Sequence, residues 1–197
     1  MRTTLFTLLL PALMTGCSTM ARKPSASFTP PTVRKVDLDR YMGEWFVIAA
    51  VPYSLEKGKV ATSDIYRKRA DGKMDNIFAF REGSFEAPQK TWEGTAWVID
   101  HETNATWKVR LFWPLTATYR ILHLDPDYRW SVVSNGNGKL VWILSKDRQM
   151  PEHQYLDILE MLERDGFEAS RLQKVPQPGA EFAPNRGSPC RCVTFPA

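Results

Sequence analysis

The sequence predicts an all-β fold, either an up-and-down antiparallel barrel or a β-sandwich, followed by one α-helix. Short stretches of alternating apolar and polar residues run from Val36 to Leu144, with turn residues between them. The gaps between the later stretches are only a few residues long, so neighbouring strands must be antiparallel and joined as hairpins. Many strands with no helix between them favour a barrel or a sandwich.

The alternation places eight strands, near residues 43–51, 60–69, 73–82, 91–100, 105–113, 117–125, 128–134 and 139–145. The breaks carry turn residues, as in the Asn-Gly-Asn-Gly of residues 135–138. The fifth stretch alternates most clearly, with Trp107 and Val109 on one face and Lys108 and Arg110 on the other.

The predicted helix begins at Pro151, a residue suited to a first turn, and ends at Gly166. Its apolar residues fall at helical spacing and form one stripe: Tyr155, Ile158, Leu159 and Leu162. Such a stripe needs an apolar surface to cover, and the outside of a barrel would serve. The apolar stretch at 172–175 is a candidate for a short last strand.

The N-terminal segment reads as a targeting signal. Residues 1–16 combine Arg2 with an apolar run that is too short to span a membrane. The run ends in Met14-Thr15-Gly16-Cys17, which resembles the lipobox of bacterial lipoproteins and implies lipidation of Cys17. Ser18 in place of Asp favours the outer membrane by the same resemblance. An ordinary cleaved signal with an incidental cysteine is the alternative.

Composition divides the rest of the chain. Residues 17–35 are rich in Ser, Thr, Pro and Lys and predict a flexible tether after the lipidated N-terminus. Residues 36–176 form the predicted domain, and the Pro-rich residues 177–197 predict a disordered tail. Cys190 and Cys192 in that tail are open to three interpretations besides a plain tail: a strained local disulfide, an intermolecular disulfide, or weak metal binding.

Charge and motifs argue against several function classes. A net charge of +4, spread along the chain, does not favour nucleic-acid binding. The sequence contains no His-Glu-x-x-His, no Gly-x-Ser-x-Gly and no Gly-rich phosphate loop. The three histidines, His101, His123 and His153, fall on different predicted elements. We therefore predict no catalytic residue, no metal site and no cofactor.

Three stretches in order carry a family resemblance: Tyr41–Phe46 with its Gly-x-Trp, Leu124–Tyr128 with its Asp and Tyr, and Val141–Lys146. With the predicted strands and helix, they make residues 36–176 resemble a lipocalin, specifically the bacterial outer-membrane lipoprotein lipocalins. The resemblance implies an eight-stranded antiparallel up-and-down β-barrel with the C-terminal α-helix packed outside.

The resemblance also implies how the barrel closes. Gly43 lets the backbone approach closely, and Trp45 plugs the end of the barrel. Asp125 and Tyr128 form the motif turn between two strands. An arginine from the last strand normally covers this tryptophan, and here Lys146 stands in its place. Arg148, two residues later, is the alternative.

Eight strands leave room for one small ligand. The resemblance and the strand alternation give six aromatic candidates for its binding site: Tyr66, Phe78, Trp107, Tyr119, Trp130 and Trp142. The alternative is that these rings fill a solid core. Arg110 and Arg120 are predicted to point outward; either would suit an acidic head group if it pointed inward.

The resulting hypothesis is a lipocalin anchored to the outer membrane, facing the periplasm, that binds a fatty acid or lysophospholipid. Its role would be storage or transport in envelope maintenance. A lipocalin-like enzyme with a buried His123, and an interaction protein with a filled barrel, are the alternatives. The sequence leaves a homodimer open.

Overall fold

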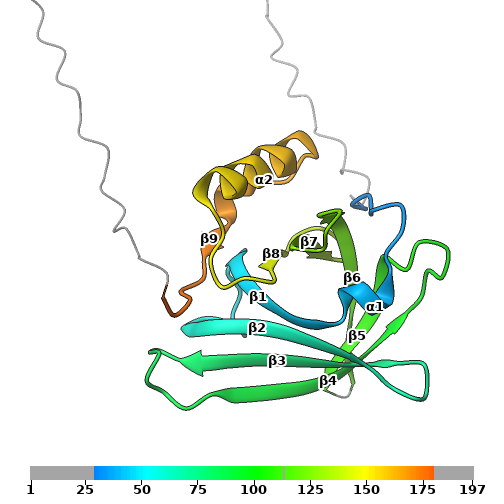
Figure 1. The fold of residues 1–197 in the computed structure, drawn as a ribbon, viewed down its shortest axis with the longest axis horizontal. Coiled ribbons are helices and arrows are strands. Elements are labelled where there is room, and N and C mark those ends of the chain that lie inside the picture. Colours follow the sequence, from blue (N-terminus) through cyan, green and yellow to red (C-terminus); the bar gives the residue numbers. More distant parts are fainter. Residues whose placement is uncertain (1–28, 113, 180–197) are drawn as a thin grey trace, which may run out of the picture.

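A computed structural model describes residues 29–112 and 114–179. The barrel strands are β1 (Gly43–Ala50), β2 (Lys59–Lys68), β3 (Met74–Glu82), β4 (Lys90–Val98), β5 (Thr106–Phe112), β6 (Leu115–Leu124), β7 (Trp130–Asn135) and β8 (Val141–Ser145). Each pairs antiparallel with the next, and β1 pairs with both β2 and β8 (Figure 1). This last pairing closes the sheet, so the predicted barrel is confirmed and the sandwich is excluded.

The elements beyond the eight strands are short, apart from one helix. The helix α2 (Glu152–Arg164) lies where the sequence predicts it, and the two-residue β9 (Gln173–Lys174) pairs with the end of β1. The one-turn helix α1 (Leu38–Tyr41) and the 3-10 turn η1 (Ala169–Arg171) were not predicted. Their few residues show no helical period, so the sequence gives little sign of them.

The one-turn helix α1 covers one end of the barrel. The Asp37 carboxylate caps it by accepting from the N–H groups of Asp39 and Arg40. The chain before it is already attached to the barrel, because the Val33 N–H donates to the Ile121 carbonyl at 3.1 Å. This attachment places Tyr41 inside the barrel end, where it is fully buried.

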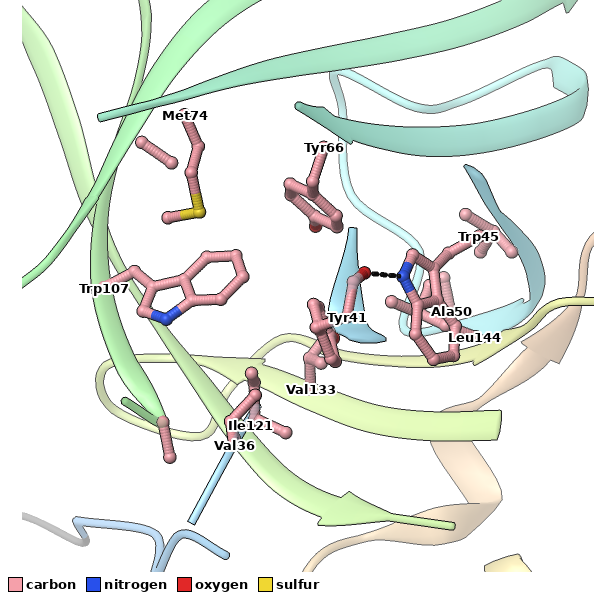
Figure 2. Close-up of a cluster of buried hydrophobic side chains, with 13 residues drawn as sticks. Val36, Tyr41, Trp45, Ala50, Tyr66, Met74, Trp107, Ile121, Val133 and Leu144 are labelled. Atoms are coloured by element: carbon pink, nitrogen blue, oxygen red, sulfur yellow. Dashed lines mark hydrogen bonds between the residues drawn. The ribbon is translucent and has the colours of Figure 1, made fainter. Parts of the chain in front are cut away.

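An aromatic cluster fills the half of the barrel next to α1. Trp45, Tyr41, Tyr66 and Trp107 are all fully or almost fully buried and lie around one centre (Figure 2). The Tyr41 and Trp107 rings meet edge to face, with centroids 5.4 Å apart. Rings of this size leave no room for a ligand at this end.

The helix α2 covers the outside of the barrel, as its apolar stripe predicts. Tyr155, Ile158 and Leu162 pack against outward-facing residues of β1, β6, β7 and β8. At the end of the helix, Asp165 accepts a hydrogen bond from the His123 ring of β6 at 2.6 Å. Among the described residues, no helix is both long and apolar enough to cross a membrane.

Candidate ligand-binding cavity

The closed end of the barrel is built around Trp45. Its ring nitrogen donates to the Tyr41 carbonyl at 2.7 Å (Figure 2). The Lys146 ammonium lies 4.0 Å from the centre of the Trp45 ring and donates to the Met42 carbonyl at 2.9 Å. Burial lowers the pKa of Lys146 to about 8, with Glu44 acting in the opposite direction. Gly43 has φ +97°, a conformation that glycine adopts at little cost.

Arg148 lies elsewhere. Its guanidinium carbon is 4.5 Å from the centre of the Phe46 ring, which packs with the α2 side of the barrel. Of the two cations considered for the place over Trp45, Lys146 therefore occupies it.

The turn between β6 and β7 is organised by Asp125 and Tyr128. The Asp125 carboxylate accepts from the N–H groups of Asp127 and Arg129, and also from the Arg129 guanidinium. Tyr128, at φ +61°, accepts the Asp37 N–H on its hydroxyl at 2.8 Å. These bonds fasten the β6–β7 turn to the cap of α1.

A cavity of about 310 Å³ occupies the other half of the barrel. It lies near the loops that follow β1, β5 and β7, at the end away from α1. Its apolar wall comes mainly from β5, β6 and the adjoining loops, and consists of Leu55, Val109, Leu111, Leu115, Ala117 and Leu140. Leu55 and Leu115 are exposed, so this wall reaches the protein surface.

The six aromatic candidates fall in four different places. Tyr119 and Trp142 line the cavity. Tyr66 and Trp107 belong to the buried cluster beneath it, and Phe78 packs with Phe80 and Trp92.

Trp130 has the opposite orientation to the one expected. It packs outside the barrel with the residues under α2. Its neighbour Ser131 points inward instead, where its hydroxyl lies 3.2 Å from the Tyr41 hydroxyl. Since neighbouring residues of a strand face opposite sides, Trp130 must point outward.

Three tyrosine hydroxyls meet at the base of the cavity, where Tyr119 lines it and Tyr41 and Tyr66 lie beneath. The Tyr66 hydroxyl donates to the Tyr119 hydroxyl at 3.1 Å, and the Tyr41 hydroxyl lies 3.0 Å from the same oxygen. Burial raises the pKa of all three, so these groups stay protonated at neutral pH. The base is polar and uncharged.

The wall opposite the apolar one carries two carboxyl groups. Glu56, in the loop before β2, accepts from the Tyr53 hydroxyl at 2.9 Å and from the Trp142 ring nitrogen at 3.2 Å. Burial raises the pKa of Glu56, although Tyr53, Trp142 and Lys59 oppose the shift. The Tyr53 and Trp142 rings meet edge to face beside the carboxylate, with centroids 5.9 Å apart.

Asp64 of β2 is the second carboxyl group. Burial and the nearby Glu56 carboxylate raise the pKa of Asp64 to about 8. Asn76 of β3 also lines the cavity and is only 4% exposed. Within residues 29–112 and 114–179, neither side chain makes a hydrogen bond to the protein. The Asp64 carboxyl and the Asn76 amide are therefore available to hydrogen-bond a ligand in the cavity.

The cationic side chains of the described barrel do not line the cavity. Of the described residues that line the cavity, none is Lys, Arg or His. Arg110 lies over the Trp97 ring, and Arg120 does not line the cavity either, as their predicted outward orientation requires. The Lys59 ammonium is 4.7 Å from the centres of both the Phe80 and Trp92 rings. His123 is engaged with Asp165 outside the barrel.

The sequence interpretation missed Asp64, Asn76 and Glu56 as lining residues. For the two strand residues a signal was present: Asp64 is two positions before Tyr66, and Asn76 two positions before Phe78. Strand alternation places each pair on one face, so an inward aromatic implies an inward polar neighbour. Glu56 lies in a loop, where no such rule applies.

Comparison with known proteins agrees with this architecture. The lipocalin-like domain family matches residues 36–177. Outer membrane lipoprotein Blc of Citrobacter freundii is 33% identical over 79% of this chain and 89% of its own length. Temperature-induced lipocalin-1 of Arabidopsis thaliana is 30% identical over 74% of this chain and 81% of its own length. The cockroach allergen Per a 4 has the same fold, with a TM-score of 0.59 and 21% identity, over 77% of this chain and 95% of its own. The chain belongs to the lipocalin family.

Proposed function

We propose that this protein binds a hydrophobic ligand in its barrel and is held at the outer membrane by a lipid anchor on Cys17, facing the periplasm. The observation that carries the ligand proposal is the cavity of about 310 Å³ with its largely apolar wall. Such a cavity argues against a barrel filled solid. Cys17 lies outside the described residues, and so do Cys190 and Cys192; the anchor rests on the lipobox resemblance and on relatives named as outer membrane lipoproteins.

Fatty acids and lysophospholipids are the ligand classes that the resemblance to bacterial members implies. An apolar chain suits the wall formed by Val109, Leu111 and Ala117. Burial of each methylene contributes about 0.8 kcal/mol, so a chain of modest length offsets the cost of association.

The role that we propose is storage or transport during envelope maintenance, with no covalent step. The specific observation that would favour an enzyme is a catalytic histidine in the cavity. His123 is instead paired with Asp165 outside the barrel. The carboxyl groups of the cavity are accordingly interpreted as binding groups.

Native mass spectrometry tests this function. The protein, purified from its source envelope, should carry a lipid or another hydrophobic compound at close to one per barrel. A competing lipid should displace it. An empty protein that also fails to take up added lipids would overturn the proposal. Globomycin treatment of the source cells tests the anchor: accumulation of the unprocessed chain is expected, and normal processing would contradict lipidation of Cys17.

A further inference from the structure

We propose that the cavity prefers a compact hydrophobic ligand that ends in a positively charged amine, with Glu56 and Asp64 as the partners of that charge. The inference rests on the proposed function, because it requires that the cavity binds a ligand. It specifies the chemical class of the polar end.

The first argument is the placement of the polar groups. Glu56 and Asp64 lie on one wall, and Asn76 on the neighbouring strand lines the same cavity. Asn76 is nine-tenths buried or more and has no side-chain partner within the described residues. Its amide lines the cavity with its hydrogen-bonding capacity unused by the protein, so a ligand group that accepts or donates there would gain a hydrogen bond.

The second argument is the character of the surrounding rings. Tyr53, Tyr119 and Trp142 line the cavity beside the two carboxyl groups. Aromatic faces attract cations, and an ammonium between a ring and a carboxylate gains from both. The Tyr53 hydroxyl and the Trp142 ring nitrogen already hold the Glu56 carboxylate through hydrogen bonds. Ligand binding therefore costs little side-chain entropy at Glu56.

The third argument is the charge balance. The Glu56 carboxylate raises the pKa of Asp64, so ionising Asp64 beside it costs free energy in this half-buried cavity. A cation between them relieves that repulsion, whereas a ligand carboxylate adds to it. Lys59 is a cation that acts on Glu56, and its ammonium lies over the Phe80 and Trp92 rings.

The volume sets the size of the ligand. At roughly 30 Å³ for each water-sized group, about ten such groups fill the cavity of about 310 Å³. The straight-chain compounds n-octylamine, octan-1-ol and octanoate are of about this size, share a C8 skeleton and differ in the polar group at one end. At pH 7 they are positive, neutral and negative.

Calorimetric titration of these three compounds into the chain from Ser18 onward tests the proposal. This chain contains every contact of the described barrel. We expect n-octylamine to bind at least about tenfold more tightly than octanoate at pH 7. Asp64→Asn and Glu56→Gln should each reduce this preference, whereas Glu93→Gln, on the exposed face of β4, should leave it unchanged. Octan-1-ol should bind all of these variants alike, which shows that the cavity is intact.

The affinity for n-octylamine should also rise from pH 6 to pH 9, as Asp64 ionises. Glu56 from the loop raises the pKa of Asp64. Asp64 in turn raises the pKa of four tyrosines around it, namely Tyr53 from the loop, Tyr66 on β2, Tyr41 on α1 and Tyr119 on β6. The four tyrosines remain protonated over this range, because their pKa values are raised. The rise should be absent in Asp64→Asn.

Other outcomes separate the two proposals. If octan-1-ol binds but n-octylamine binds no better than octanoate, the amine preference is wrong and the hydrophobic cavity stands. If octanoate binds most tightly and Lys59→Met abolishes its binding, the polar end selects acids instead. If the preference survives both carboxyl variants, the assigned partners are wrong. If none of the three compounds binds, the proposed function itself is overturned.

Discussion

The Lys146 ammonium lies 4.0 Å from the centre of the Trp45 ring and donates to the Met42 carbonyl at 2.9 Å. A single lysine thus contacts both the plug of the barrel and the backbone that leads into β1. An arginine is implied at this place by the lipocalin resemblance. The contacts made here support a lysine in the same role, although it lacks the planar fork of a guanidinium.

Replacing Lys146 tests its contribution to closure. Lys146→Met keeps an apolar stem but loses the cation–π contact and the hydrogen bond, so we expect the free energy of unfolding to fall by about 1 kcal/mol. Lys146→Arg should retain most of it. Urea unfolding at pH 7 measures both. Arg148→Met is the matched control, since Arg148 lies over Phe46 on the outside; an equal loss in this control would remove the special role of Lys146.

Helix α2 offers a second test, of packing. Leu162 is fully buried against the barrel, whereas Leu156 of the same helix is 54% exposed. Leu162→Ala should cost about 2–5 kcal/mol in urea unfolding, because it removes apolar contacts and leaves a cavity. Leu156→Ala should change stability by about 0.5 kcal/mol or less. Similar losses in the two variants would mean that α2 does not dock as described.

Much of this fold could be predicted because its signals are local. Strand alternation and turn residues place the eight strands to within about two residues, and the stripe of α2 predicts an apolar partner surface. The orientation of Trp130 could not be fixed in this way. Its strand is only six residues long and buries residues on both faces, inside the barrel and under α2, so no polar face marks the outside.

The cavity was harder to predict than the fold. Of the six aromatic residues predicted to line the cavity, two do so, Tyr119 and Trp142. Whether an inward ring lines a cavity or fills a core depends on its height along the barrel axis, and that height follows from strand register. Glu56 comes from a loop whose path depends on its bond to Trp142, 86 positions away. Such a contact leaves no periodic trace in the sequence.

Gly94 provides a third test, in which two effects have opposite signs. An added Cβ at Gly94 would lie 2.6 Å from the Arg110 carbonyl oxygen on β5. Strand preference alone would make Gly94→Ala stabilising by about 0.5–1 kcal/mol. The clash with a backbone atom in a paired strand should exceed that, giving a net loss of about 1–3 kcal/mol in urea unfolding. Glu93→Ala, one position away and exposed, should be nearly neutral. A stabilised Gly94→Ala would show that the β4–β5 pair is looser than described.

The raised pKa of Asp64 leads to the last prediction, on the pH dependence of stability. The pKa of this carboxyl rises from an ordinary value near 4 to about 8 on folding, because of burial and the Glu56 carboxylate. Between these pH values the unfolded chain has lost this proton and the folded chain keeps it, so stability must fall as the pH rises. Glu56, whose pKa is also raised, acts in the same direction.

Replacing Asp64 removes the contribution of this carboxyl to the pH dependence. Asp64→Asn should match the original protein at pH 4 and be more stable at pH 8 by about 2 kcal/mol, a value kept below the full shift because the cavity admits solvent. Urea unfolding at several pH values measures the difference, with Asp75→Asn on the outer face of β3 as the control. Parallel curves for the original protein and Asp64→Asn would mean that Asp64 is already ionised in the folded barrel, and the cavity would then hold a permanent negative charge at neutral pH.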